Sequence, residues 1–406
     1  MKNKKKLVGI ILVSISVIVA AYIVGKRLYW NYQVAHAEKL VELKTKKIEV
    51  YEKDVKLSKL ISSINGTLDT NPKINTNKLG KQKIKFKYTT DEGYPVKHEV
   101  EIEVVDSTPP LISQSSLKTI YSDYNGNLSE EFFCGDIYDP NPKCTIEGEY
   151  DTHVPGTYSL KFIGEDSSGN ISAHNFQLIV KERPQSTTGG GTWNADYTDF
   201  NEIVSKYKKD DKTHIGIDVS HHQGDIDFQR VKNAGVEFAY IRVGRGDGIG
   251  KDYVLDTKFE QNIKGFNDVG IPVGVYFYSN ANSKKDAKKE AKWLMEKIKD
   301  YKVDLELVFD WENWGDFQSY DFSFYSISQA FEEFSKTVKS KGYTGMLYSS
   351  KNYLQDVWFP TKQPVWIAHY TNKTSYVGQY KVWQLCDDGR VDGINGYVDL
   401  DIMSDL

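Results

Sequence analysis

Hydrophobic and polar positions divide the chain into three stretches with different periods. The first is an almost unbroken apolar run over residues 7–24. Between residues 46 and 182, apolar and polar positions alternate with a period of two, which predicts short β-strands. From residue 213 onward, apolar strands alternate with segments of helical period. The chain is therefore expected to combine an apolar helix, a β region and an α/β domain.

The apolar run is long enough to cross a membrane. Residues 7–24 number 18, and a helix of this length spans roughly 27 Å, close to the hydrocarbon core of a bilayer. Four lysines precede it and a basic pair follows it, so the positive-inside rule places the lysines in the cytoplasm. We expect residues 1–27 to be a transmembrane signal anchor, with cleavage near Ala37 as the alternative. Both interpretations place the later domains outside the cell.

An internal repeat of 76 residues runs through the β region. The aligned positions are Gly80 and Gly156, Ile84 and Leu160, Phe86 and Phe162, Gly93 and Gly169, and residues 100, 102 and 104 with 176, 178 and 180. The alternating apolar positions predict one buried strand face, present in two copies. We expect a polar stalk at 28–45, followed by two small all-β sandwiches at 46–106 and 107–182.

The second copy resembles the immunoglobulin-like repeats of bacterial surface proteins. The resemblance rests on Pro155-Gly156-Thr157-Tyr158 and Asp166-Ser167-Ser168-Gly169-Asn170, and it is weaker in the first copy. It implies a spacer or adhesion module without chemistry of its own. A passive stalk is one interpretation, and binding to the wall or to cell-envelope proteins is the other.

The last stretch predicts a barrel. A Gly/Ser/Thr linker at 183–212 precedes a domain at 213–406, whose strands are expected at 215–219, 237–243, 273–278, 305–312, 345–348, 365–370, 382–385 and 397–401. Eight is the number of strands that closes a parallel barrel with a filled interior. The connections between the last three are too short for crossover helices. We therefore expect an α/β fold, an irregular TIM-like (β/α) barrel with fewer helices than strands.

Charge argues against nucleic acid as a partner, and the cysteines predict a disulfide and no metal site. The chain has 52 basic and 56 acidic residues, a net charge of −4, so it lacks the cationic field that binds nucleic acid. Cys134 and Cys144 flank the turn-forming segment 139–142, and a disulfide is expected between them in an exported chain. Cys386 is expected to be a free, partly buried thiol. Cys and His residues lack metal-ligand spacing, so neither a metal nor another cofactor is expected.

Acidic residues coincide with the ends of predicted strands. Asp218 ends the first strand, Asp310 and Glu312 end the fourth, and Asp399 lies in the eighth. Catalytic groups of such barrels lie at the carboxyl ends of the strands, and positions two apart on a strand share a face. Apolar surroundings and neighbouring carboxylates raise the pKa of an acid. Two acids with separated pKa values are what glycoside hydrolysis requires.

Aromatic residues occupy the same strand ends: Tyr276, Tyr278, Trp311, Trp366, Tyr370 and Trp383. Flat rings can stack on the apolar faces of sugars, and tyrosine hydroxyls can bind ring substituents. Packing in the barrel core or at its rim is the alternative for each of them.

These residues resemble glycoside hydrolase family 25. The matching motifs are Gly216-Ile217-Asp218-Val219-Ser220 with Gln223-Gly224 and Ile226-Asp227, Phe309-Asp310-Trp311-Glu312, Val365-Trp366-Ile367-Ala368-His369-Tyr370, Trp383-Gln384 and Val398-Asp399-Leu400. They keep one order over residues 214–406. The resemblance implies a lysozyme, an N-acetylmuramidase that cuts the β-1,4 bond between N-acetylmuramic acid and N-acetylglucosamine in peptidoglycan.

The resemblance also implies roles for individual residues. Glu312 corresponds to the general acid, and Asp310 to the residue that orients the substrate N-acetyl group or stabilises the charged intermediate. Asp218 and Asp399 would complete the acidic site. The expected sugar-binding residues are Tyr276, Tyr278, Trp366, Tyr370, Gln384 and Arg242.

Two positions depart from the family pattern and could change sugar affinity or pH optimum. Asp401 stands where Asn is frequent, and His222 replaces a common tryptophan. The alternatives for the whole chain are a catalytically silent glycan-binding protein of the cell wall and a glycosidase of other bond specificity.

Overall fold

The computed structural model describes residues 2–183 and 197–404. Their contacts group into two compact units, Met1–Ser107 and Thr108–Leu406. The Gly189-Gly190-Gly191 run of the expected linker lies outside the described residues.

The first unit opens with a long helix, α1 (Lys2–His36). The stretch Gly9–His36 has a mean hydropathy of 2.2 over its most apolar window, none of which is buried, so it could cross a membrane by length and composition. The apolar helix predicted from the sequence is therefore present. Within residues 28–45, where a partly helical stalk was expected, α1 continues to His36 and β1 (Val41–Leu43) pairs with β3 (Ile61–Ile64).

The predicted internal repeat is confirmed by strand pairing. In the first copy β5 (Gly80–Thr90) pairs antiparallel with β6 (Pro95–Val105), and in the second β11 (Gly156–Glu165) pairs with β12 (Ile171–Lys181). Gly80 lies opposite Val104 in the first hairpin, as Gly156 lies opposite Val180 in the second. Both hairpins therefore share one register, displaced by 76 residues along the chain.

Each copy builds one four-stranded sheet and one two-stranded sheet, less than the full sandwiches expected. The remaining elements of the first copy are β2 (Lys47–Glu49), α2 (Leu57–Leu60) and β4 (Gly66–Leu68). Those of the second are β7 (Leu111–Ile112), β8 (Leu117–Tyr121), η1 (Leu128–Glu131), β9 (Cys134–Gly135) and β10 (Lys143–Glu147). The predicted disulfide joins Cys134 to Cys144, with Cα atoms 6.5 Å apart.

Eight of the described strands close into the predicted barrel. They are β14 (Thr213–Val219), β15 (Phe238–Gly246), β17 (Val273–Tyr278), β18 (Leu307–Asp310), β19 (Gly345–Ser350), β20 (Val365–Ala368), β21 (Val382–Arg390) and β22 (Val398–Ser404). Pairing from β14 to β21 is parallel throughout. The last strand, β22, is antiparallel to both of its neighbours. The barrel is thus not fully parallel.

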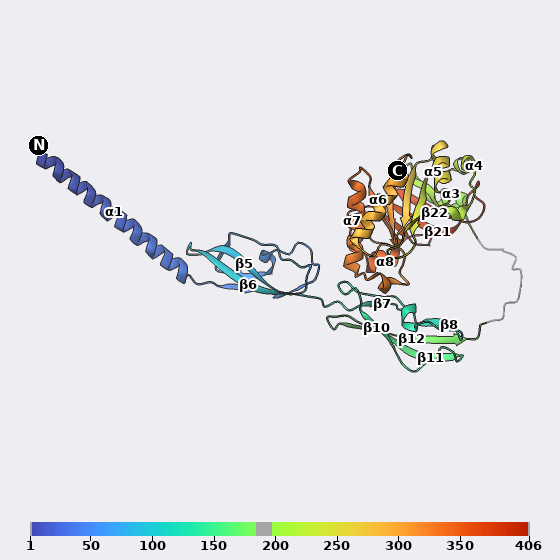
Figure 1. Ribbon diagram of the computed structural model, residues 1–406, viewed down its shortest axis with the longest axis horizontal. Helices are drawn as coiled ribbons and strands as arrows, with labels where there is room; N and C mark the ends of the chain where they lie inside the picture. Colours follow the sequence, from blue (N-terminus) through green and yellow to red (C-terminus); the bar gives the residue numbers. More distant parts are fainter. Residues whose placement is uncertain (1, 184–196, 405–406) are drawn as a thin grey trace. The chain divides into compact units, whose positions relative to one another are not determined.

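Helices cover the outside of the first part of the barrel (Figure 1). They are α4 (Phe228–Ala234), α5 (Phe259–Asp268), α6 (Lys284–Ile298), α7 (Phe324–Lys339) and the short α8 (Lys351–Asp356). Between β20 and β22, the described connections hold no helix, as the short spacing predicted. Outside the closed barrel lie α3 (Phe200–Tyr207), β13 (Thr198–Asp199), which pairs with β21, and β16 (Tyr253–Leu255), which pairs with β15.

The barrel has two apolar layers. Helix faces pack on the outward-facing strand residues, in a core that includes Ile217, Ile241, Phe309 and Phe331. A second cluster fills the interior, with Tyr240 and Trp366 among its largest members. The interior is therefore packed with side chains, and polar groups are left to gather at one end.

The second β copy packs directly on the barrel. Leu111, Phe133 and Ile137 are part of the apolar layer around the barrel core, and the main-chain N–H of Phe324 donates to the carbonyl of Asp136 (2.8 Å). The sequence predicted a separate sandwich at 107–182 and a barrel at 213–406. The structure places both in one compact unit.

Candidate active site

Three of the four predicted acids come together at one end of the barrel. Asp218 lies near the end of β14 and Asp310 ends β18. Asp399 is the second residue of β22 and is the register partner of Asp218. Because β22 is antiparallel, its beginning lies where the other strands end. Asp399 therefore lies at the same end of the barrel as the other acids, although it stands near the beginning of its strand and not at its end.

Glu312 lies beyond the strand that was expected to carry it. β18 ends at Asp310, so the two residues do not share a face of a regular strand. Their carboxyl groups nevertheless interact, because each changes the pKa of the other. Asp310 is buried, with 4% of its surface exposed, whereas Glu312 is exposed to solvent. The pair thus joins an inner carboxyl to an outer one that a ligand can reach.

Burial controls the protonation of these acids. It raises the pKa of Asp218 and Asp310 well above the usual range, and the neighbouring charges of Asp399 and Glu312 respectively add to the effect. Burial and the charge of Asp387 raise the pKa of Asp399 to about 7. The protein atoms around the Glu312 carboxyl also raise its pKa, although its interaction with Asp310 opposes this. These shifts all favour the protonated form of the carboxyls at the barrel end.

Asp401 belongs to the site and was noted from the sequence only as a departure from the family pattern. It is fully buried, and Trp366 Nε1 donates to its Oδ1 (2.8 Å). Its carboxyl also interacts with that of Asp218, because each changes the pKa of the other. Burial and the charge of Asp399 hold the pKa of Asp401 well above the usual range. Asp401 could have been predicted as a site residue, because it stands two residues after Asp399 and therefore on the same face of the strand.

Gln384 connects the acids to two tyrosines. Its Nε2 donates to Asp218 Oδ2 (2.8 Å), and its Oε1 accepts from Tyr348 (2.8 Å) and Tyr370 (3.1 Å) hydroxyls. Tyr348 was not predicted as a site residue, although it ends the predicted fifth strand. Tyr370 is 52% exposed and can meet a ligand. Gln384 therefore fixes one buried and one accessible tyrosine around Asp218.

The other predicted aromatics differ in accessibility. Tyr276 and Tyr278 are half-buried on β17, and burial together with the charge of Glu312 raises the pKa of Tyr278 to about 12. Trp366 is only 2% exposed and lies in the barrel interior. It is therefore placed as a support for Asp401, and it offers little surface for stacking on a sugar.

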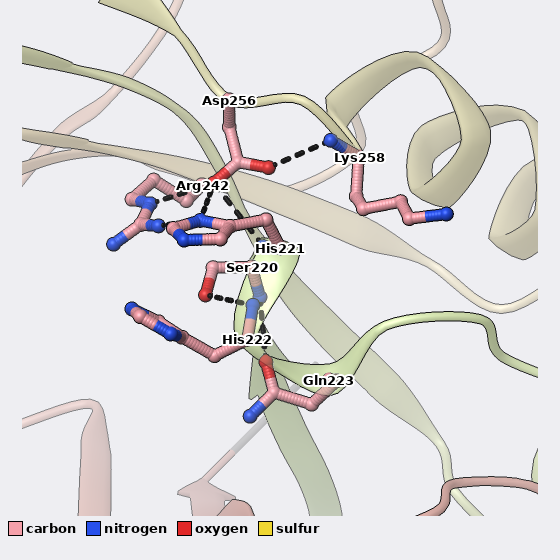
Figure 2. A network of polar contacts seen from close by, with 7 residues as sticks. All are labelled: Ser220, His221, His222, Gln223, Arg242, Asp256 and Lys258. Atoms are coloured by element: carbon pink, nitrogen blue, oxygen red, sulfur yellow. Dashed lines mark hydrogen bonds and ion pairs between the residues drawn. The ribbon is translucent and has the colours of Figure 1, made fainter.

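Arg242 is anchored beside the acids by Asp256. Figure 2 shows Arg242 and His221 converging on this carboxylate: Arg242 Nε donates to Asp256 Oδ2 (2.9 Å), and His221 Nδ1 lies 3.0 Å from the same oxygen. Burial alone would raise the pKa of Asp256, but the hydrogen bonds from Lys258 N–H, His221 and Arg242 outweigh it and lower the pKa. His222 packs against His221, with ring centroids 4.1 Å apart. Neither Asp256 nor this support of Arg242 was predicted.

The chemistry of this barrel end is that of acids and hydroxyls. In the described part of the barrel, no three carboxylate, histidine or cysteine ligands lie mutually close enough to hold a metal ion. What the arrangement offers is an accessible carboxyl with a raised pKa beside a buried carboxyl, within a set of tyrosines. Such a pair can donate a proton to an oxygen and stabilise a positive charge.

Comparison with known proteins identifies the barrel. Residues 217–394 match the family model of glycosyl hydrolases family 25, a range that includes Asp218, Asp310 and Glu312 and ends before Asp399. The barrel domain is therefore similar to glycosyl hydrolases of family 25. The family resemblance predicted from the sequence is thereby confirmed.

Two relatives of the barrel domain are named lysozymes. The chain is 32% identical over 194 residues to the autolytic lysozyme of Clostridium acetobutylicum. This alignment covers 47% of this chain and 56% of that protein. It is 27% identical over 202 residues to lysozyme M1 of Streptomyces globisporus, covering 45% and 65%. The chain thus spans less than two thirds of the length of either lysozyme.

A family 25 glycosyl hydrolase structure from Bacillus anthracis is also similar. It shares 21% identity with a TM-score of 0.43, over 52% of this chain and 94% of that one.

Proposed function

We propose that the barrel domain is a lysozyme that hydrolyses the β-1,4 bond between N-acetylmuramic acid and N-acetylglucosamine in peptidoglycan. The observation that carries the proposal is the interacting pair of exposed Glu312 and buried Asp310 in a barrel that matches the family 25 model. The similarity to two lysozymes supports the substrate class.

In this proposal Glu312 is the general acid. Its raised pKa favours the protonated carboxyl, and its exposure lets that proton reach the glycosidic oxygen of the leaving sugar. Asp310 orients the N-acetyl group, whose carbonyl oxygen attacks the anomeric carbon as the bond to the protonated leaving sugar breaks. Water then attacks the same carbon and breaks the new bond to the carbonyl oxygen, so the two inversions retain the configuration overall. Asp399, with a pKa of about 7, is partly ionised at neutral pH and stabilises the positive charge that develops on the ring, while Asp218 lies beside it as its register partner. Tyr276, Tyr278 and Tyr370 contact the sugars.

The test uses the full chain in detergent with purified peptidoglycan. Released fragments are reduced with borohydride and analysed by mass spectrometry. Reduced muramic acid at the new ends is the expected result, whereas reduced glucosamine would contradict the assigned bond. Glu312→Gln should bind glycan without releasing fragments, because the amide keeps the shape and lacks the acidic proton. Asp316→Asn, an exposed carboxylate in the same loop, is the matched control and should retain activity.

The N-terminal helix supports a proposed location for the enzyme. We infer that α1 anchors the chain in the cytoplasmic membrane and that the barrel acts on the outer side, where peptidoglycan lies. The first β copy, over residues 46–106, is proposed to be an immunoglobulin-like spacer between membrane and enzyme. Alkaline carbonate should leave the chain in the membrane fraction, and protease added to spheroplasts should digest the barrel. Release by carbonate would contradict the anchor.

A further inference from the structure

The loop that follows Glu312 is covered by the second β copy. This loop, residues 313–323, leads from the candidate acid to helix α7. It contains Trp314, the short helix η3 (Phe317–Tyr320) and Asp321, which has a positive φ of 55°. A non-glycine residue in that region is strained and persists where its surroundings hold it.

Phe133 fills an aromatic cluster on this loop. Its ring centroid lies 5.4 Å from that of Phe317, 5.6 Å from Tyr353 and 6.3 Å from Trp314. Trp314 and Tyr353 stack at 3.8 Å. The cavity that remains between the second β copy and the loop is only about 50 Å³. Phe133 therefore packs in the apolar layer of the barrel, although it belongs to the β copy.

Hydrogen bonds connect the same two parts. Gln318 Nε2 donates to the carbonyl of Pro142 (2.9 Å) and lies 3.1 Å from Cys144 Sγ, so the disulfide loop contacts η3. The Asn141 side chain donates to the carboxylate of Asp321. These bonds hold both the helical turn and the strained residue of the loop.

The opposite side of the loop is held by the barrel itself. Asn313 Nδ2 donates to the carbonyl of Ser279 (2.9 Å), and its Oδ1 accepts from Asn280 Nδ2 (3.1 Å). The main-chain N–H of Trp314 donates to the carbonyl of Glu312 (2.8 Å). Glu312 is thus followed at once by two residues fixed from opposite sides: Asn313 by the barrel and Trp314 through the cluster that Phe133 completes.

We propose that residues 108–182 act as a positioning domain of the enzyme, in which Phe133 is the positioning residue that fixes the loop behind Glu312. The second β copy then has a role beyond that of a passive spacer. The role in catalysis rests on the proposed lysozyme function. The role in ordering the loop does not, because it follows from the contacts alone. A small displacement of a general acid is enough to lower the rate about 100-fold.

The experiment compares Phe133→Ala, Phe133→Leu and the control Tyr150→Ala in the full chain. Tyr150 is a partly exposed aromatic of the same β copy. Amide hydrogen exchange of residues 313–320 is measured first, and kcat and KM on a soluble glycan fragment second. We expect Phe133→Ala to speed exchange at least 10-fold and to lower kcat 10- to 100-fold with little change in KM. Phe133→Leu should restore most of the wild-type exchange protection and most of the wild-type kcat. Tyr150→Ala should match the wild type in both.

Unchanged exchange in Phe133→Ala would overturn the proposal, as would faster exchange with unchanged kcat. If Phe133→Ala does not fold, Gln318→Ala decides the question, because it removes the contacts to Pro142 and Cys144 and leaves the aromatic cluster intact. Faster exchange and a lower kcat are expected there too, and wild-type values for both would overturn the proposal. If the wild type hydrolyses no glycan, the lysozyme function and the catalytic role both fail, while hydrogen exchange still decides whether the second β copy orders the loop.

Discussion

Asp218 and Asp399 face each other as register partners on the antiparallel strands β14 and β22. The negative charge of Asp399 raises the pKa of Asp218, in addition to the larger effect of burial. The two residues therefore titrate as a coupled pair at the end of the barrel.

The first prediction concerns the pH dependence of this pair. The pKa of Asp399 is raised to about 7, so we expect a limb near pH 7 in the profile of log kcat/KM. Asp399→Asn should remove this limb and lower kcat/KM about 10-fold or more. The control Asp392→Asn, at an exposed carboxylate paired with Arg230, should keep the limb. A limb that persists near pH 7 in Asp399→Asn would assign it to another group.

The second prediction concerns stability. Glu290 is buried on α6, where it accepts hydrogen bonds from the Ser279 hydroxyl (2.6 Å) and the Asn280 N–H (3.1 Å), and burial raises its pKa to about 8. An acid with a raised pKa contributes stability below its unfolded pKa, near 4.5, that is lost as the pH rises to about 8. Within this window, the titration of Glu290 should therefore lower the free energy of unfolding by roughly 1.4 kcal/mol per pH unit.

Denaturant unfolding of Glu290→Gln between pH 5 and 9 tests this. The neutral amide cannot ionise, so the stability of the variant relative to wild type should rise with pH up to about 8 and then level off. Glu296→Gln is the control on the same helix, since Glu296 is exposed and paired with Lys299. Parallel curves for Glu290→Gln and wild type would show that Glu290 does not titrate in this range.

The third prediction concerns the disulfide. Cys134 and Cys144 are separated by ten residues in sequence, and closing a loop of this size stabilises a fold by about 2–3 kcal/mol through the unfolded state. Cys134→Ala with Cys144→Ala should lower the free energy of unfolding by that amount. Loss of the contact between Cys144 and Gln318 should also loosen the loop behind Glu312. Cys386→Ala is the control, because Cys386 is the buried free thiol. Equal stability of both variants would contradict the prediction.

Much of this fold can be predicted from the sequence, because its signals are local. The hairpins of the β region follow from period-two alternation, and the same glycines recur at Gly93 and Gly169 with positive φ. The barrel strands follow from short apolar runs. The family motifs were sufficient to select Asp218, Asp310 and Glu312 as candidates, because each acid stands at a fixed position within a short motif that the family shares.

The direction of β22 was missed, although a signal was present. Seven residues, 391–397, connect β21 to β22, and a parallel crossover needs a dozen or more. The position of Glu312 beyond the end of β18 could not be predicted in the same way, because the run of apolar residues that indicates a strand continues through Trp311.

The packing of the second β copy on the barrel depends on tertiary contacts. Phe132 and Phe133 are adjacent, so in an extended chain they face opposite sides. Phe132 is buried in the core of the β copy, which leaves Phe133 for another surface. The pair indicates that a second surface must exist, but it cannot show that this surface is the loop behind Glu312.

The last prediction distinguishes a protonated acid from a charged one at Asp401. Its carboxyl is fully buried and its pKa is held well above the usual range, so we expect the neutral form at pH 7. Asn has nearly the same shape and retains an oxygen to accept from Trp366 Nε1. Asp401→Asn should therefore change the free energy of unfolding by less than about 1 kcal/mol. It should also lower the pKa of Asp218, because the Asp401 carboxyl contributes to raising it.

Asp401→Ala should behave differently. It leaves the buried Trp366 N–H without its acceptor and opens a small cavity, which together should cost about 2–4 kcal/mol. Thermal unfolding of both variants at pH 7, with carboxyl ¹³C shifts of Asp218, provides the measurement. If Asp401→Asn were as destabilising as Asp401→Ala, a charged Asp401 would be required. The buried end of the barrel would then hold its protons on Asp218 and Asp310 instead.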